Sequence, residues 1–372
     1  MSGAMRLLGI IALWLTLGVV PSYGADPVRI ATYTVELDRK RPGLLLRDIL
    51  KGDDPQVLAA ARIIARIHPD VILLTRFDYD LGGVALAAFA DVLAQGGAHY
   101  PHRFAFRPNT GRASGLDLDG DGRLGGPADA QGFGWFAGQS GMAILSRYPL
   151  DHDRTRDFSG LLWQDLPGAI LPQVAGVPFP SRRAQAEQRL STTGHWDVPV
   201  LLPDGRRLNL LAFHATPPVF DGPEDRNGLR NRDEVRFWRV LWDGALPWLP
   251  PDPPFVLIGN ANLDPTGGQG HRSEIVALLA DPRIQDPMPQ SAGAAIAGQR
   301  DPVIARTDTV AWDAEGEPGN MRVDYVLPSA DLTVLDAGVF WPTPDDPDVA
   351  LLGEGGRAAS RGRLVWVDLE FP

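Results

Sequence analysis

Apolar and polar positions alternate in the first third of the chain in a way that predicts strands and helices in turn. Residues 28–37 and 71–75 are short apolar runs rich in β-branched side chains, which is typical of buried strands. Residues 55–68 and 84–93 repeat apolar side chains at helical spacing. This alternation is typical of α/β proteins, in which helices cover a sheet.

Strand patterns dominate the middle and the end of the chain. Two apolar runs within residues 192–216 surround Pro203-Asp204-Gly205, a turn sequence, and predict a hairpin. The remaining expected elements are helices over 231–242 and 273–280, and strands over 104–108, 142–150, 255–259, 322–329, 332–342 and 363–371. Without an internal repeat or a convincing linker, the pattern predicts one α/β sandwich of mixed sheets covered by helices.

The first residues have the pattern of a secretory signal peptide. Arg6 precedes an apolar run over residues 7–20, and Pro21, Gly24 and Ala25 suit a cleavage site. The run is too short to span a bilayer comfortably, although a retained membrane anchor is the alternative. We expect residues 1–24 to be removed, residues 25–372 to form the mature domain, and the protein to be exported to a periplasm or beyond.

Composition narrows the possible chemistry. The formal net charge of −11 argues against a protein that coats nucleic acid, although it allows a locally basic pocket. The chain has no cysteine, which excludes disulfides, thiolate metal sites, cysteine nucleophiles and a lipoprotein anchor. Any catalysis must therefore use histidine, carboxylates, hydroxyls, lysine or a metal held by oxygen and nitrogen.

Polar side chains follow several of the expected strands. The apolar run before Gly259 leads into Asn260-Ala261-Asn262, where two amides stand at the end of a buried strand. Comparable positions elsewhere in the chain are occupied by Thr34, Arg76, His214, Asp324 and the turn Ser360-Arg361-Gly362. If these strand ends meet at one edge of the sandwich, they form a single pocket.

In these features the chain resembles the endonuclease/exonuclease/phosphatase superfamily of DNase I-like proteins, especially exported bacterial members. The segments that carry the resemblance are FDYD, LDLDGDGRLGGPADAQGFG, GMAILSRYP, TPPVFDGPEDRNG and RVDYVLPSADLTVLDAGVFWP. The resemblance covers nearly the whole mature chain and implies a four-layer sandwich of two mixed sheets flanked by helices. It also implies Mg²⁺- or Mn²⁺-dependent hydrolysis of phosphoric esters, which needs positive charge on the phosphate oxygens and a positioned base.

Several positions depart from the family pattern. His214, Asn262 and Asp324 match family site positions. The family asparagine after the first strand is replaced by Thr34, its metal-binding glutamate by Arg76, and a common tyrosine by Ser140. The family aspartate of the Gly-Asp-x-Asn loop is replaced by Asn260, and its Asp-His pair by Arg361-Gly362.

These departures remove metal-binding and base groups. Arginine is always charged and only donates hydrogen bonds, asparagine cannot take a proton, and glycine has no imidazole. We therefore expect a pseudoenzyme in which the Mg²⁺ or Mn²⁺ site is lost. The alternative is an active metal-dependent phosphodiesterase or phosphatase with relocated ligands among Glu36, Asp38, Asp78 and Asp80.

Two hypotheses about the role of Arg76 and Arg361 remain open. Arg76 and Arg361 beside His214 and the two asparagines would form a cationic pocket that binds phosphate or another anion without cleaving it. Alternatively, Arg76 pairs with Asp324 and Arg361 with another carboxylate, which would fill the site. Nucleic-acid binding without cleavage is a third possibility that the net charge disfavours.

A second candidate site lies in a glycine-rich loop. Asp117, Asp119 and Asp121, followed by Gly122, fit the first half of a calcium-binding loop. The twelfth position is Ala128 instead of glutamate, with Asp129 next to it. We expect a structural Ca²⁺ here; the alternative is a solvated turn. For Phe133, Trp135 and Phe136, and for Arg226 and Asn227, a place in the pocket and a purely structural role both remain possible.

Overall fold

The computed structural model describes residues 27–312 and 318–371, so the expected signal peptide lies outside the described residues. One mixed sheet has the strand order β12-β13-β1-β2-β4-β3 and the other the order β11-β10-β9-β8-β5. The first contains β1 (Val28–Leu37), β2 (Val71–Phe77), β3 (His102–Phe104), β4 (Gly141–Ser146), β12 (Thr333–Val339) and β13 (Val365–Glu370). The second contains β5 (Arg156–Asp157), β8 (Gly194–Leu201), β9 (Arg207–His214), β10 (Phe255–Asn260) and β11 (Asp324–Pro328).

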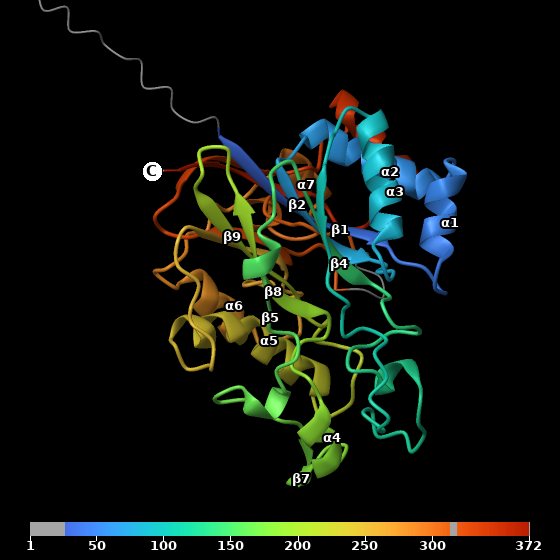
Figure 1. The fold of residues 1–372 in the computed structure, drawn as a ribbon, viewed down its shortest axis with the longest axis vertical. Helices are drawn as coiled ribbons and strands as arrows, with labels where there is room; N and C mark the ends of the chain where they lie inside the picture. The colour runs from blue at the N-terminus through green and yellow to red at the C-terminus, as the bar shows by residue number, and fades with distance from the viewer. Residues whose placement is uncertain (1–26, 313–317, 372) are drawn as a thin grey trace, which may run out of the picture.

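Helices cover the outer face of each sheet, as Figure 1 shows. Helices α1 (Leu44–Lys51), α2 (Pro55–Ile67) and α3 (Val84–Gln95) pack on the first sheet, and α5 (Arg226–Trp242) and α6 (Arg272–Leu279) pack on the second. The shorter elements are α4 (Arg182–Glu187), α7 (Ala292–Ala297), α8 (Pro302–Ala305) and the small hairpin of β6 (Gln173–Val174) and β7 (Val177–Pro178). The expected four-layer sandwich is thereby confirmed.

Alternate side chains of β9 belong to two different apolar clusters, one on each face of the strand. Leu208, Leu210 and Ala212 belong to the apolar cluster between the sheets, whereas Leu211 and Phe213 pack with α5 on the other face. Successive side chains of a strand point to opposite faces, so a strand covered on both sides is apolar throughout. The predicted turn between β8 and β9 is confirmed, with the amide of Gly205 donating to the carbonyl of Leu202 (2.9 Å).

Three expected elements in particular differ from the structure. Only His102–Phe104 forms a strand where residues 104–108 were expected, and β4 ends at Ser146. Helix α5 begins at Arg226, five residues before the expected start, because its first turns bury polar side chains that interrupt the apolar spacing. Arg230, for example, is 5% exposed and donates to the carbonyls of Gln131, Arg189 and Leu190. Within the described ranges, no helix is both long enough and apolar enough to cross a membrane.

Candidate active site

A cleft of about 780 Å³ opens at the edge of the sandwich where β1, β2, β9, β10 and β11 end or begin. Its lining includes all nine residues that the sequence singled out as retained or substituted site positions: Thr34, Arg76, Ser140, His214, Asn260, Asn262, Asp324, Arg361 and Gly362. The prediction that these strand ends converge on one pocket is therefore confirmed.

Asp324, at the start of β11, is the buried centre of the cleft floor. One of its carboxylate oxygens, Oδ1, accepts from Thr34 Oγ1 (2.6 Å) and Asn260 Nδ2 (3.0 Å). The other, Oδ2, accepts from Thr309 Oγ1 (3.2 Å), a contact that the sequence did not reveal. Burial raises the pKa of Asp324 to about 7, although these hydrogen bonds favour its charged form. Asp324 is therefore largely satisfied by protein donors.

The two amides after β10 are held in the same way. Asn260 Nδ2 also donates to Thr34 Oγ1 (3.0 Å), and Asn260 Oδ1 accepts from the amide of Asn262 (2.8 Å). Asn262 has a positive φ of 49° and donates from Nδ2 to the carbonyl of Ala215 (2.8 Å). With asparagine at position 260, this loop has hydrogen-bonding capacity but no negative charge or proton acceptor.

His214, at the end of β9, is an uncharged member of the site. It is 8% exposed, and its Nδ1 lies 3.5 Å from Thr193 Oγ1. Burial, together with the nearby positive charge of Arg76, lowers the pKa of His214 to about 3. Its Nε2 atom has no hydrogen-bond partner among the described residues, so a neutral imidazole offers one polar atom to the cleft.

Glu36, near the end of β1, binds both arginines of the cleft. Its Oε1 accepts from Arg76 Nη1 (2.6 Å) and Arg361 Nη2 (2.8 Å), and its Oε2 accepts from the amide of Arg361 (2.9 Å). Arg76 Nη2 also lies 3.1 Å from both carboxylate oxygens of Asp38. Arg76 therefore pairs with Glu36 and Asp38, and the alternative that paired it with Asp324 is wrong. The other half of that alternative is confirmed, because Arg361 pairs with a carboxylate, that of Glu36.

Two neighbouring irregularities bring Glu36 and Arg76 together. The parallel pairing of β1 and β2 shifts register between Thr34 and Leu37, where Glu36 and Arg76 have positive φ values of 52° and 56°. Bulges of this kind re-aim side chains at strand ends. The bulge that turns Glu36 toward Arg76 leaves no pattern in the apolar spacing, so the sequence suggests Glu36 only as a relocated metal ligand.

The positive charges of the two arginines in the cleft are balanced by nearby carboxylates, so the cleft has no net positive charge from them. Burial raises the pKa of Glu36, but the two arginines outweigh burial and hold its pKa below the ordinary value. The ionisable side chains that line the cleft are Glu36, Asp38, Asp264, Asp324, Arg76 and Arg361, together with the uncharged His214. Asp264 is itself paired with Arg300 (2.7 Å). The expected excess of positive charge is therefore absent from the described lining.

Gly362 occupies a position with no room for a side chain. A Cβ atom added there would lie 2.5 Å from the carbonyl oxygen of Thr34 and 2.9 Å from its Cβ. The neighbouring Ser360 donates from Oγ to the same Thr34 carbonyl (2.6 Å) and so holds the turn against β1. The turn therefore lies too close to β1 to admit an imidazole at position 362 without a backbone shift.

The carboxylates proposed as relocated ligands are occupied by protein donors. Asp78 accepts from the amides of Ser140 (2.9 Å) and Arg39 (2.8 Å), and burial raises its pKa to about 6. Asp80 accepts from the first amides of α3, at Val84 (2.8 Å) and Ala85 (2.7 Å). In the described chain, no three carboxylate or imidazole groups meet around Asp324. The donor set at the cleft thus does not fit Mg²⁺ or Mn²⁺, which prefer several oxygen ligands.

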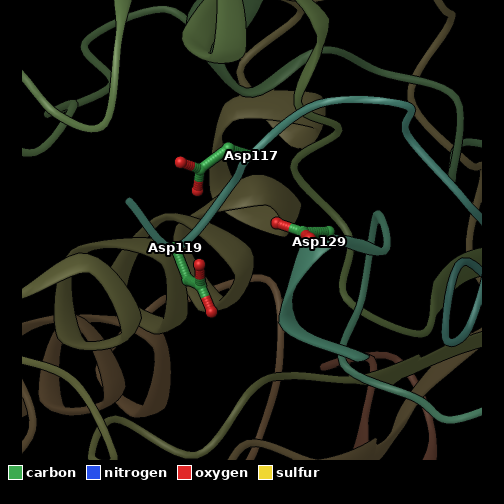
Figure 2. Close-up of side chains that lie close together, drawn as sticks. All are labelled: Asp117, Asp119 and Asp129. Atoms are coloured by element: carbon green, nitrogen blue, oxygen red, sulfur yellow. The ribbon is translucent and has the colours of Figure 1, made fainter. Parts of the chain in front are cut away.

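The glycine-rich loop brings three carboxylates together, as Figure 2 shows. They belong to Asp117, Asp119 and Asp129, and one ligand oxygen from each lies within 4.8 Å of the others. The expected third member, Asp121, is not in this group; its Oδ1 instead accepts from the amide of Arg123 (2.7 Å). Asp129 replaces it because residues 127–129 fold back as a short 3₁₀ helix. Calcium binding itself stays a prediction.

The remaining candidates divide between the cleft and its supports. Phe133 and Trp135 line the cleft, and Phe136 does not. Arg226 donates to the carbonyl of Leu118 (2.8 Å) in the glycine-rich loop. Asn227 donates from Nδ2 to the carbonyl of Val219 (2.7 Å). Neither Arg226 nor Asn227 lines the cleft; both hold neighbouring loops in place.

The chain resembles known proteins in sequence and in fold. The model of the "Endonuclease/Exonuclease/phosphatase family" matches residues 48–361, whereas a comparison with curated proteins gave no match. An endonuclease/exonuclease/phosphatase from Beutenbergia cavernae is 17% identical, covering 93% of this chain and 72% of its own, with a TM-score of 0.53. That level of identity shows a shared fold alone.

Two further solved structures are similar at lower scores. A mannosyl-6-phosphatase from Bacteroides thetaiotaomicron is 13% identical over 92% of this chain and 100% of its own, with a TM-score of 0.48. A beta toxin variant from Staphylococcus aureus with bound magnesium ions is 11% identical over 94% and 100%, with a TM-score of 0.46. Because the family model spans most of the sequence and the fold agrees with it, this chain belongs to the endonuclease/exonuclease/phosphatase family.

Proposed function

We propose that this protein is a catalytically degenerate member of its family, a pseudoenzyme that binds a ligand in the cleft without hydrolysing a phosphoric ester. The observation that carries the proposal is the pairing of Arg76 with Glu36 (2.6 Å) and Asp38 (3.1 Å). A guanidinium stands where the family resemblance expects a metal-binding carboxylate. The fixed positive charge of this guanidinium repels a cation and occupies the carboxylate oxygens that would otherwise bind the cation.

The loss of a base supports the same proposal. Phosphoryl transfer to water requires a group that positions or deprotonates the nucleophile, together with positive charge on the phosphate oxygens. Asn260 cannot take a proton, and Gly362 has no imidazole. Asp324 keeps its carboxylate, but Thr34, Asn260 and Thr309 already donate to it.

The alternative of an active hydrolase with relocated ligands has less support. It requires carboxylates that are free to turn toward Asp324. Both oxygens of Asp78 and both oxygens of Asp80 accept backbone hydrogen bonds, which would have to break before either residue could bind a metal. Breaking such bonds at a buried carboxylate costs about 1–3 kcal/mol each.

The predicted affinity for phosphate is also weakened by these pairs. An anion entering the cleft would compete with Glu36, which already binds both arginines at 2.6 and 2.8 Å. We therefore propose that the native cleft binds anions poorly. Export remains part of the proposal: the sequence before residue 25 has the composition of a cleaved signal, and mass spectrometry of protein secreted by an expression host would test the cleavage site.

The decisive experiment is hydrolysis of bis-p-nitrophenyl phosphate by the purified mature protein with Mg²⁺, Mn²⁺ or Ca²⁺. We expect no metal-dependent turnover above that of an Asp324→Asn variant prepared in the same way, which controls for contaminating hydrolases. Metal-dependent turnover that disappears in Asp324→Asn would contradict the pseudoenzyme proposal and favour an active hydrolase with relocated metal ligands.

A revertant provides the positive control. It carries Thr34→Asn, Arg76→Glu, Asn260→Asp, Arg361→Asp and Gly362→His. Because a side chain at position 362 would overlap Thr34, a four-fold revertant that keeps Gly362 should be made in parallel and both checked for folding by circular dichroism. Turnover by a folded revertant, with none by the native chain, would show that the scaffold is sound and that the substitutions removed the activity.

A further inference from the structure

Exposed aromatic side chains gather at the cleft. Across the described residues, the phenylalanine and tryptophan side chains in the exposed class are Phe133 (58% exposed), Trp135 (69%) and Phe220 (87%), and all three line the cleft. The other described aromatic side chains are buried or partly buried. Large apolar side chains left in water around one hollow are typical of a ligand-binding groove.

The loop that presents two of these aromatic side chains is held in place. Gly134, between Phe133 and Trp135, lies so close to Gly111 that an added Cβ would be 2.6 Å from the Gly111 nitrogen. The amide of Trp135 donates to Gln139 Oε1 (2.7 Å), and Gln139 Nε2 donates to the carbonyl of Arg39 (2.9 Å). These contacts present the aromatic side chains on a defined backbone, which lowers the entropy cost of binding.

Phe220 comes from another segment of the lining, the one that leads into α5. It has a positive φ of 69°, an unfavourable backbone conformation for a phenylalanine. The preceding carbonyl, at Val219, accepts from Asn227 Nδ2 (2.7 Å) at the start of α5. Backbone strain of this kind is common at ligand clamps, where the surrounding structure holds the residue.

The floor between these aromatic side chains is polar, and its charges are balanced. Asn262, His214 and Thr193 offer amide, imidazole and hydroxyl groups, while Arg76 and Arg361 are paired with Glu36. A purely apolar ligand would leave the polar groups without partners, and an anion would have to displace Glu36. An uncharged ligand that has both apolar faces and hydroxyl groups satisfies the rim and the floor together.

We propose that the cleft binds a neutral carbohydrate chain, with the C–H faces of its sugar rings packed on Trp135, Phe133 and Phe220 and its hydroxyls bonded to the polar floor. This inference rests on the proposed function, because it assumes that the ligand is bound and not hydrolysed. Aromatic rings suit such a ligand since they supply large, rigid apolar area at low conformational cost. The volume of about 780 Å³ lies within the range of small-molecule sites, roughly 300–1,000 Å³.

The test is isothermal titration of the mature protein with linear tetraoses of glucose, mannose, galactose and xylose. We expect saturable binding of at least one, unchanged between 50 and 500 mM NaCl because no charge is involved. Trp135→Ala and Phe220→Ala should each weaken that binding at least tenfold. Leu249→Ala removes a side chain that is 82% exposed and outside the cleft, and this matched control should bind as the native chain does.

Three outcomes would overturn the inference. They are no binding of any tetraose at millimolar concentration, binding that survives both aromatic substitutions, and binding of phosphatidylcholine vesicles in place of sugars, which would make the aromatic side chains a membrane contact. The assay with bis-p-nitrophenyl phosphate tests the pseudoenzyme proposal separately. If no sugar binds, the pseudoenzyme proposal still holds. If the protein shows metal-dependent turnover, the pseudoenzyme proposal is wrong, and sugar binding can still be measured.

Discussion

Carboxylates gather in two regions of this molecule, and the two regions treat them differently. At the cleft, Glu36 binds two guanidiniums, and Asp324 accepts from hydroxyl and amide donors. In the glycine-rich loop, Asp117, Asp119 and Asp129 approach one another with backbone amides as their main partners. In the cleft, arginine side chains neutralise the carboxylate of Glu36. In the glycine-rich loop, three carboxylates lie close together. The cleft thus neutralises its carboxylates with protein groups, whereas the glycine-rich loop has the arrangement of carboxylates that a cation would stabilise.

The largest expected effect concerns the buried carboxylate of the cleft. The pKa of Asp324 is raised to about 7, against about 3.9 in the unfolded chain, so between these pH values the native state holds the extra proton. The stability that this proton contributes is complete below pH ~4 and is lost as pH rises through ~7. Asp324→Asn should remove this dependence, which amounts to a few kcal/mol of unfolding free energy.

Urea titrations of the native chain and Asp324→Asn at pH 5 and pH 8 would measure that difference. Glu234, whose pKa burial also raises to about 7, is present in both proteins and cancels in the comparison. Asp153→Asn, at an exposed position, is the matched control. Equal pH dependence in native and Asp324→Asn proteins would mean that Asp324 is charged in the folded state and that the cleft does not neutralise it.

The next effect tests how closely the cleft floor is packed. Gly362→Ala places a Cβ 2.5 Å from the Thr34 carbonyl and should lower the unfolding free energy by about 1–3 kcal/mol. Gly355→Ala is the comparison for a glycine with open space, although its positive φ of 69° adds strain of its own. A Gly362→Ala protein as stable as the native chain would mean that the turn can move and that an imidazole could return there.

A smaller effect is expected from the counter-charge of the cleft. Glu36→Gln leaves Arg76 paired with Asp38 but withdraws the carboxylate shared with Arg361, so inorganic phosphate should bind at least tenfold more tightly, about 1.4 kcal/mol. Calorimetry at low salt would measure this. Asp348→Asn breaks the surface pair with Arg66 (2.7 Å) and should leave phosphate affinity unchanged. Unchanged affinity in Glu36→Gln would show that Glu36 does not hold anions out.

The smallest effect concerns the loop. At ten times its dissociation constant, Ca²⁺ would stabilise the protein by about 1.4 kcal/mol and raise the melting temperature by roughly 1–3 °C. Asp119→Asn should abolish this shift, because Asp119 is one of the three converging carboxylates. Asp121→Asn should preserve it. A shift lost in Asp121→Asn but kept with Asp129→Asn would restore the ligand set expected from the sequence.

The sequence predicted the sandwich and the convergence of its strand ends because both follow from period-two and helical patterns and from the family segments. It did not predict which charges meet. Glu36 reaches Arg76 through a local register shift, and Thr309 reaches Asp324 from a loop 15 residues earlier in the chain. Asp129 joins Asp117 through a turn that depends on loop packing. Such contacts depend on backbone detail that a one-dimensional pattern does not contain.

The carboxylate of Glu36, which both arginines share, also couples the substitutions that would be needed to build a metal site in the cleft. Reversing Arg76 to glutamate alone would place its carboxylate beside those of Glu36 and Asp38 and take away one of the two guanidiniums that bind Glu36. Reversing Arg361 alone would remove the other. Each single substitution toward the family pattern therefore removes a counter-charge of Glu36 while the rest of the cleft still lacks the ligands of a metal site. Arg76, Arg361 and Glu36 therefore form one coupled unit, and all three would have to change together before this cleft could hold a divalent metal.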